Sequence, residues 1–209
     1  MKIEIANDFA PSKIVCVGRN YAEHAAELGH EVPKEPMLFL KAPSAVVHDG
    51  ESIVIPPQSQ QVEHESELAI VIGRKCKDLT DLDDPFEYVL GFSCLNDVTA
   101  RDLQRKDGQF ARAKSFDTFC PIGPHIETEL DVTDIRVTTK VNGVLKQDGR
   151  TSQMVFPVDF LIRYISNIMT LNVGDVIATG TPSGVSKMKN GDVCEVEIEG
   201  IGVLRNIVA

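Results

Sequence analysis

Three glutamates, Glu63, Glu65 and Glu67, alternate along one short stretch of this sequence. The apolar, β-branched run at residues 68–72 that follows is typical of a strand buried on both faces. Because alternate side chains of a strand share a face, we expect the three carboxylates to point the same way. Desolvated carboxylates need a cationic partner, and oxygen ligands suit Mg²⁺, Mn²⁺ or Ca²⁺. The alternative is a solvated acidic strand end, since an E-x-E pair is a short pattern.

A further oxygen ligand is available where the next buried strand, predicted at residues 88–95, ends. Asp97 follows it directly and is the candidate third ligand, although it could equally cap the helix predicted at residues 99–106. On that helix, Arg101 and Gln104 lie on adjacent turns and could bind a carboxylate together. An ordinary solvated helix face would explain the same two residues.

A histidine–glutamate pair lies near the start of the chain. A strand at residues 13–18 leads into a helix predicted at residues 21–28, with Asn20 as its N-cap. His24 is on the apolar face of this helix, and Glu27 is three residues further on, within side-chain reach. A carboxylate that orients a histidine is the usual arrangement of a general base. The alternative is a helix histidine with an incidental surface partner.

Two other segments contain candidate binding groups. Lys114 lies in an irregular, aromatic stretch at residues 109–121. A strand at residues 173–179 runs into Gly180 and Thr181, in a loop rich in glycine and hydroxyl groups. The backbone N–H groups of such a loop can bind an oxyanion, or the loop can be a simple turn.

The remaining sequence predicts the fold class. A hairpin is expected at residues 135–145, turning at Asn142-Gly143, and a second one at residues 192–208. Pro157 opens a helix whose expected buried stripe is Phe160, Leu161, Tyr164, Ile165 and Ile168. No repeat or linker interrupts the chain. We therefore expect one domain over residues 1–209, mainly β with a few helices (α+β).

Composition excludes several classes of function. The 209 residues are 43% hydrophobic and 25% charged, as in an ordinary globular protein. The net charge of −10 argues against nucleic acid and anionic membranes as partners. With no apolar run of about 20 residues and no visible signal peptide, we expect a cytoplasmic protein. The five cysteines are scattered without C-x-x-C spacing, which predicts reduced thiols and no zinc site.

Six motifs then occur in order: G-R-N-Y-x-x-H-x-x-E, H-E-S-E-L-A-I-V-I-G, N-D-V-T-A-R-D-L-Q, A-K-S-F-D-T-F-C-P-I-G-P, V-N-G and G-D-V-I-A-T-G-T-P-S-G-V. Together they resemble the fumarylacetoacetate hydrolase family, in particular its short acylpyruvase and oxaloacetate decarboxylase-like members. The resemblance covers residues 13–208. It implies a mixed β-sandwich roll, a homodimer, and a Mg²⁺ or Mn²⁺ site in which Ca²⁺ could substitute.

The resemblance also assigns roles, position by position. The metal ligands correspond to Glu65, Glu67 and Asp97, which leaves Glu63 out. The water-activating dyad corresponds to His24 and Glu27, and Lys114 matches a lysine that reaches the substrate's oxygens. The positions that hold substrate correspond to Arg19, Arg101, Gln104, Gly180 and Thr181. Two departures, Phe110 in place of a frequent tryptophan and Ala42 in place of a proline, change the shape of the pocket.

These roles imply a Mg²⁺- or Mn²⁺-dependent hydrolase. It would cleave a C–C bond in a small 2-oxo or diketo acid, such as an acylpyruvate or fumarylpyruvate, through a metal-chelated enolate. The alternatives are an oxaloacetate decarboxylase, or an isomerase of the 2-hydroxyhepta-2,4-diene-1,7-dioate or 5-carboxymethyl-2-hydroxymuconate type. A non-catalytic, metal-stabilised binding domain is the alternative from a different class.

Overall fold

The computed structural model describes residues 1–6 and 9–209, and β-strands dominate it, as predicted. The larger sheet has the strand order β1 (Lys2–Glu4), β10 (Cys120–Glu127), β8 (Val89–Asn96), β7 (Ser66–Ile72), β13 (Val176–Ala178), β2 (Ile14–Gly18), β3 (Met37–Lys41), and β4 (Val46–Val47) pairs with β10. The smaller sheet has the order β12 (Val144–Arg150), β11 (Arg136–Val141), β14 (Val193–Ile198), β15 (Gly202–Val208), β5 (Ser52–Ile53). A short ribbon joins β6 (Val62–Glu63) to β9 (Thr99–Ala100).

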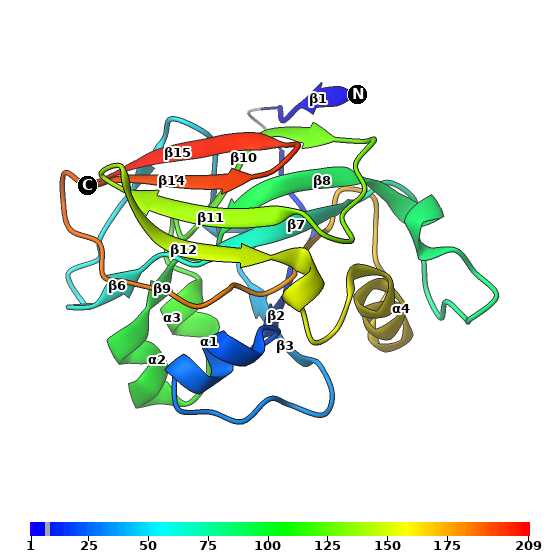
Figure 1. Ribbon diagram of the computed structural model, residues 1–209, viewed down its shortest axis with the longest axis horizontal. Helices are drawn as coiled ribbons and strands as arrows, with labels where there is room; N and C mark the ends of the chain where they lie inside the picture. The colour runs from blue at the N-terminus through cyan, green and yellow to red at the C-terminus, as the bar shows by residue number, and fades with distance from the viewer. Residues whose placement is uncertain (7–8) are drawn as a thin grey trace.

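The smaller sheet packs across one face of the larger one (Figure 1). Every residue of β7 is buried, because the strand has β8 and β13 as neighbours and is covered on both faces. The core between the sheets is apolar and includes Leu68, Ile70, Val137, Val196 and Leu204. Burial of this kind contributes about 25 cal/mol per Å² of apolar surface. It fixes β7, and therefore the glutamates at its start.

Four α-helices are described: α1 (Ala22–Glu27), α2 (Arg101–Asp107), α3 (Ala111–Lys114) and α4 (Val158–Ile168). Short 3₁₀ turns are η1 (Pro43–Ala45), η2 (Pro85–Tyr88) and η3 (Thr151–Gln153). Figure 1 shows α1, α2 and α3 gathered along one side of the sandwich, with α4 apart from them. None of the described helices is long and apolar enough to cross a membrane. The three clustered helices frame the candidate site.

One local prediction about a helix was wrong and another was only partly right. Asn20 does not cap α1, whose N-cap is Tyr21 without a side-chain hydrogen bond. Its amide instead donates to the carbonyls of Phe156 and Thr179, at 3.0 and 2.8 Å, and so joins two distant segments. In α4 the predicted stripe was only partly right, because Phe160 is 41% exposed.

The α4 error has a simple cause. Leu161 and Ile165 are fully buried as expected, but Val158 and Ile162 complete the buried face. Ile168, at the end of the helix, is 53% exposed. The packed side of α4 is thus rotated from the predicted one, because the face that meets the sheet is set by tertiary packing and not by the helix alone.

Both hairpins were predicted correctly. Asn142 and Gly143 have φ angles of 51° and 76°, as the type I′ turn requires, and β14 returns as β15. The cysteines described as free are all buried. Burial raises the pKa of the Cys120 thiol to about 12, which makes it a small apolar side chain at neutral pH.

Candidate active site

Three carboxylates converge where β7 begins and β8 ends. Glu67 lies in β7, Glu65 immediately precedes it, and Asp97 immediately follows β8. These two strands are antiparallel, with Ser66 opposite Asn96, so their charged ends are adjacent. One oxygen from each of Glu65, Glu67 and Asp97 lies within 4.8 Å of the others, and all three residues are buried. The structure therefore brings together the three residues that were expected to form the metal site.

Two buried lysines neutralise one side of this cluster. Lys114 Nζ donates to Glu65 Oε2 at 2.8 Å and to Asp97 Oδ2 at 2.6 Å. Lys41 Nζ donates to Asp97 Oδ1 at 2.6 Å. The nearby carboxylates hold the pKa of Lys114 above its usual range, although burial alone would lower it. The Lys114 ammonium group therefore remains charged.

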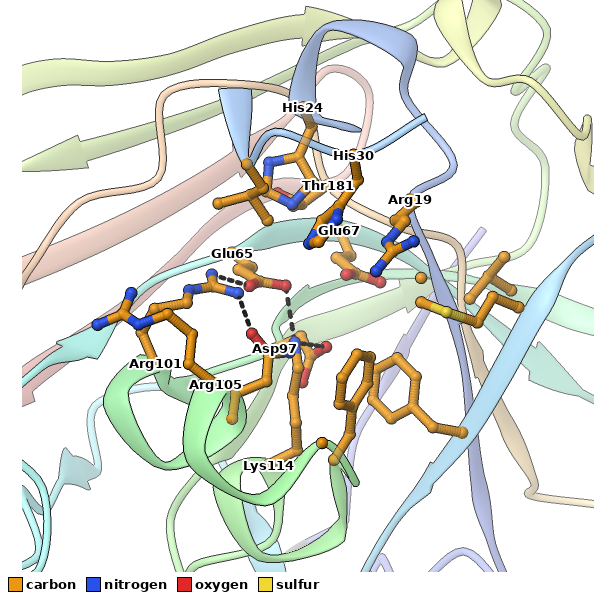
Figure 2. A pocket seen from close by; sticks show the side chains of 18 residues that line it. Arg19, His24, His30, Glu65, Glu67, Asp97, Arg101, Arg105, Lys114 and Thr181 are labelled. Atoms are coloured by element: carbon orange, nitrogen blue, oxygen red, sulfur yellow. Dashed lines mark hydrogen bonds and ion pairs between the residues drawn. The ribbon is translucent and has the colours of Figure 1, made fainter. Parts of the chain in front are cut away.

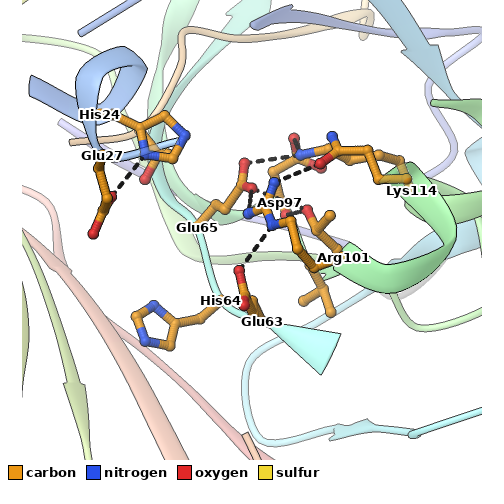
Figure 3. A network of polar contacts seen from close by, with 12 residues as sticks. His24, Glu27, Glu63, His64, Glu65, Asp97, Arg101 and Lys114 are labelled. Atoms are coloured by element: carbon orange, nitrogen blue, oxygen red, sulfur yellow. Dashed lines mark hydrogen bonds and ion pairs between the residues drawn. The ribbon is translucent and has the colours of Figure 1, made fainter. Parts of the chain in front are cut away.

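Arg101 pairs with protein carboxylates as well. It donates through Nε to Glu63 Oε2 at 2.8 Å and through Nη2 to Glu65 Oε1 (Figure 3). Its Nη1 donates to Gln104 Oε1 at 2.6 Å. Arg101 and Gln104 do meet on adjacent turns as predicted, but the guanidinium is largely engaged by the site's own acids.

Glu63 shows that the initial three-glutamate interpretation was too symmetric. It belongs to β6, which pairs with β9, and the strand is interrupted before β7 begins. Its carboxylate accepts hydrogen bonds from Arg101 and Gln61, outside the convergent triad. The assignment that left Glu63 out of the ligand set agrees with this placement.

Glu67 is the member of the triad without a cationic hydrogen-bond partner among the described residues. Its Oε2 accepts one hydrogen bond, from the Gly180 N–H at 2.7 Å. Burial, and then the charges of Asp97 and Glu65, raise the pKa of Glu67 well above its usual range. A third buried carboxylate that lacks positive charge, beside two others, fits a hard divalent cation with oxygen ligands. The residues present therefore suit Mg²⁺ or Mn²⁺.

The predicted dyad is present on α1. His24 Nδ1 lies 3.2 Å from Glu27 Oε2, and the histidine is 4% exposed. Glu27 in turn accepts hydrogen bonds from the Gly184 N–H, at 3.0 and 3.2 Å to its two oxygens. This arrangement orients the imidazole from behind, with the other ring nitrogen left for the pocket.

A cavity of about 330 Å³ is lined by His24 of the dyad and by the three carboxylates of the triad (Figure 2). The predicted residues that line it are Arg19, His24, Glu65, Glu67, Asp97, Arg101, Gln104, Lys114 and Thr181. Glu27 and Gly180 do not line it, but each holds a residue that does, through the hydrogen bonds to His24 and Glu67. Figure 2 shows His24 and the carboxylates on facing sides of the space.

Arg19 reaches the cavity from an unusual backbone conformation. Its φ of 57° lies in the left-handed region, which non-glycine residues seldom adopt. It forms no ion pair with the part of the chain that the structure describes. Strained residues of this kind concentrate at functional sites, and an unpaired guanidinium in a cavity is available to an anionic ligand.

Sequence reasoning missed several residues of the site. Lys41 is 1% exposed and pairs with Asp97, a contact that the sequence alone did not predict. His30, Arg105 and Phe39 also line the cavity. Phe39 forms an edge-to-face pair with Phe110, which the resemblance had placed in the pocket, with ring centroids 5.3 Å apart. The sequence does contain a signal for Lys41, which is a lysine at the end of an apolar stretch. A lysine that such a stretch carries into the core needs a carboxylate partner, because buried lysines are almost always paired.

Comparisons with known proteins identify the family of this chain. Residues 13–209 match the family described as fumarylacetoacetate (FAA) hydrolase, C-terminal. An uncharacterized protein of Methanocaldococcus jannaschii is 52% identical over 96% of this chain and 84% of its own length. The human mitochondrial oxaloacetate tautomerase FAHD2A is 45% identical, over 95% of this chain and 67% of its own.

Solved structures show the same fold. The 5-carboxymethyl-2-hydroxymuconate delta-isomerase of Mycobacterium smegmatis superposes with a TM-score of 0.91 at 46% identity, covering 99% of this chain and 82% of that one. The fumarylacetoacetate hydrolase of Exiguobacterium antarcticum superposes with a TM-score of 0.88 at 46% identity, covering 96% and 76%. The predicted mixed β-sandwich fold is confirmed. This chain belongs to the fumarylacetoacetate hydrolase family of enzymes.

Proposed function

We propose that this protein is a divalent-metal-dependent tautomerase that interconverts the keto and enol forms of a small 2-oxo dicarboxylic acid of the oxaloacetate type. The observation that supports it most directly is the cavity, in which an oriented histidine faces an acidic triad suited to a hard cation. The names of the 42–45% identical relatives, oxaloacetate tautomerases, point to the same substrate class.

The chain's own residues supply the proton transfer. With Nδ1–H donating to Glu27, His24 has its Nε2 lone pair free to act as the base. This nitrogen removes a proton from C3 of the keto acid and delivers it to the 2-oxo oxygen, which gives the enol without loss or gain of atoms. The reverse sequence regenerates the keto form. Glu27 keeps the imidazole in the required tautomer throughout.

Positive charge around the cavity binds the substrate. Glu65, Glu67 and Asp97 would hold the divalent ion, which when bound supplies Lewis acidity toward the 2-oxo acid. Lys114 has three donors and two serve Glu65 and Asp97, so the third is assigned to the substrate's oxygen. Arg19, which has no ion-pair partner among the described residues, is assigned to the distal carboxylate.

Hydrolysis of an acylpyruvate-type C–C bond is the second candidate. The dyad favours it, because a histidine oriented by a carboxylate can also deprotonate a water that attacks the distal carbonyl. The apolar wall formed by Phe39 and Phe110 could accept an acyl group. The two reactions share the triad and the base, and differ in what His24 deprotonates.

The test follows the enol absorbance of oxaloacetate, with the rate due to free Mg²⁺ subtracted, and assays acetylpyruvate hydrolysis in parallel. We expect the wild type with Mg²⁺ to accelerate tautomerisation, EDTA to abolish the effect, and His24→Ala to lower kcat by about 100-fold or more. His48→Ala, outside the cavity lining, is the matched control and should retain activity. Hydrolysis of acetylpyruvate without tautomerase activity would favour the second candidate, and wild-type rates in His24→Ala would refute the base assignment.

A further inference from the structure

Gln147 is a fully buried amide on β12, in the smaller sheet, and it uses all of its hydrogen-bonding groups. Its Nε2 donates to Thr181 Oγ1 at 2.7 Å and to the Pro182 carbonyl at 2.8 Å. Its Oε1 accepts from the Ser66 N–H at 3.0 Å, and also lies 2.9 Å from Thr139 Oγ1 and 2.8 Å from His64 Nδ1. Gln147 thus connects Ser66, which lies between the proposed ligands Glu65 and Glu67, to the loop at residues 180–184.

The orientation of this amide follows from its partners. The Pro182 carbonyl can only accept and the Ser66 N–H can only donate, so the amide nitrogen faces the loop and its oxygen faces β7. His64 Nδ1 must then carry a proton, because an amide oxygen donates nothing. Its Nε2 accepts from Ser186 Oγ at 2.9 Å. The network therefore has one consistent arrangement of donors and acceptors.

A β-bulge directs the Gln147 side chain inward. Thr139 pairs with Gln147 but Lys140 pairs with Leu145, so Lys146 is the extra residue on β12. Leu145 is 46% exposed while Gln147 is fully buried, although the two would share a face in a regular strand. Bulges that redirect a side chain are frequent next to active sites.

The loop contacts the bulge closely. Gly184 has a φ of 100°, and a Cβ there would lie 2.0 Å from the Lys146 carbonyl oxygen. A glycine is therefore required at this position for the loop to rest against β12. The loop is held against β12 by the hydrogen bonds from Gln147 and by this close backbone contact at Gly184.

The loop at residues 180–184 contacts both the proposed metal site and the histidine–glutamate dyad. At one end, the Gly180 N–H donates to Glu67, the carboxylate for which the described residues provide no cationic hydrogen-bond partner. At the other, the Gly184 N–H binds Glu27, which orients His24. Thr181 and Pro182, the two residues that accept hydrogen bonds from Gln147, lie between these two contacts.

We propose that Gln147 is a positioning residue: by fixing the Thr181–Pro182 segment, it sets Glu67 and the His24–Glu27 dyad at their working separation. The kinetic part of this inference rests on the proposed function, and the metal-binding part does not. Groups that orient ligands typically contribute ~10–100-fold in affinity or activity.

The test compares Gln147→Met and Gln147→Glu with Thr139→Val. Gln147→Met removes all of the amide's bonds, whereas Gln147→Glu retains the acceptor for Ser66 and loses the donors to the loop. Thr139→Val removes a bond to the same Gln147 oxygen and leaves the loop contacts intact, which makes it the structural control. We expect kcat on oxaloacetate to fall by ~10–100-fold in both Gln147 variants, with KM changed less than about threefold and kcat unchanged in Thr139→Val.

A double substitution separates positioning from general damage. If Gln147 acts through Glu27, adding Gln147→Met to Glu27→Gln should lower kcat by less than about threefold, whereas independent effects would multiply. Equal loss of kcat in Thr139→Val, or full multiplication in the double variant, would overturn the proposal. Thermal unfolding of each variant identifies any that does not fold, in which case Gln147→Glu replaces Gln147→Met.

Mn²⁺ titration is the readout that does not depend on turnover. We expect Mn²⁺ to bind about tenfold more weakly to both Gln147 variants and with unchanged affinity to Thr139→Val. If the wild type does not act on oxaloacetate, the proposed function fails and this titration alone decides the inference about Gln147. Equal Mn²⁺ affinity in all variants would overturn it.

Discussion

Glu65 and Glu67 are two residues apart, both buried, yet their environments are opposite. Although burial alone would raise it, the charges of Lys114 and Arg101 hold the pKa of Glu65 well below its usual range. Within the described part of the chain, Glu67 accepts a hydrogen bond only from the Gly180 N–H, and burial together with Asp97 raises its pKa. Both carboxyl groups are desolvated, but neighbouring positive charge favours the ionised form of Glu65, whereas Glu67 favours its protonated form.

The difference shows how the site divides its work. The Glu65 side is self-neutralised, and its geometry is fixed by the protein's own lysines and arginine. Among the described residues Glu67 has no cationic hydrogen-bond partner, and so it is the member of the triad that a cation would stabilise most. A buried pair is costly to break from one side only, because the remaining charge has no partner. Substitutions of Glu65 and of Glu67 should consequently change the free energy of unfolding in opposite directions.

The largest expected effect comes from comparing Glu67→Gln with Glu65→Gln. Either change should lower activity by about 1,000-fold or more, since each removes a proposed ligand. In EDTA, however, Glu65→Gln should lower the free energy of unfolding by about 3–5 kcal/mol, because it leaves Arg101 and Lys114 partly unpaired. Glu67→Gln should leave it unchanged or higher. Denaturant unfolding of both variants provides the measurement, and a loss of similar size in Glu67→Gln would contradict the comparison.

The same pair predicts a pH dependence. Because the folded-state pKa of Glu67 is above its unfolded value, its contribution to stability is present below about pH 4.3 and is lost as the pH rises. The ion-free wild type should therefore lose stability relative to Glu67→Gln as the pH rises above about 4.3, the unfolded-state pKa of a glutamate. Saturating Mg²⁺ should reverse that loss, since the ion binds the charged form.

Lys41→Met tests the self-neutralised side. It removes the ammonium that donates to Asp97 Oδ1 at 2.6 Å and to the Val98 carbonyl at 3.2 Å. We expect the free energy of unfolding to fall by about 3 kcal/mol, since Lys114 still pairs with Asp97. Lys140→Met is the matched control: its pair with Glu197 is about half exposed and should contribute less than about 1 kcal/mol. Equal losses in the two variants would mean that burial does not strengthen the Lys41 pair.

The residues that sequence could place are those whose position follows from strand and helix geometry. The run at residues 68–72 had to be a core strand, and Asp97 had to lie at the end of the next one. His24 and Glu27 are on one helix, so their contact depends only on helical spacing. Assigning roles to these residues required the family resemblance as well.

Other features depend on long-range packing. Lys41 and Asp97 are 56 residues apart, and only the folded sheet shows that they pair. Asn20 looked like a helix cap, but its amide is used by segments more than 130 residues away. Gln147 was not singled out because its inward direction results from a bulge, which breaks the alternation on which strand predictions depend.

Arg19 provides the smallest and most specific test. Its guanidinium lines the cavity but takes no part in the ion pairs of Glu65 and Asp97. If its guanidinium binds the distal carboxylate of a dicarboxylic acid, Arg19→Met should raise KM for oxaloacetate by about tenfold, the loss of one charge-assisted hydrogen bond. KM for acetylpyruvate, which has one carboxylate, should change less than about twofold. Arg205→Met, at an exposed position of β15, controls for the change in net charge. An equal rise in KM for both substrates would place Arg19 at the 2-oxo acid end, and the dicarboxylate assignment would then be wrong.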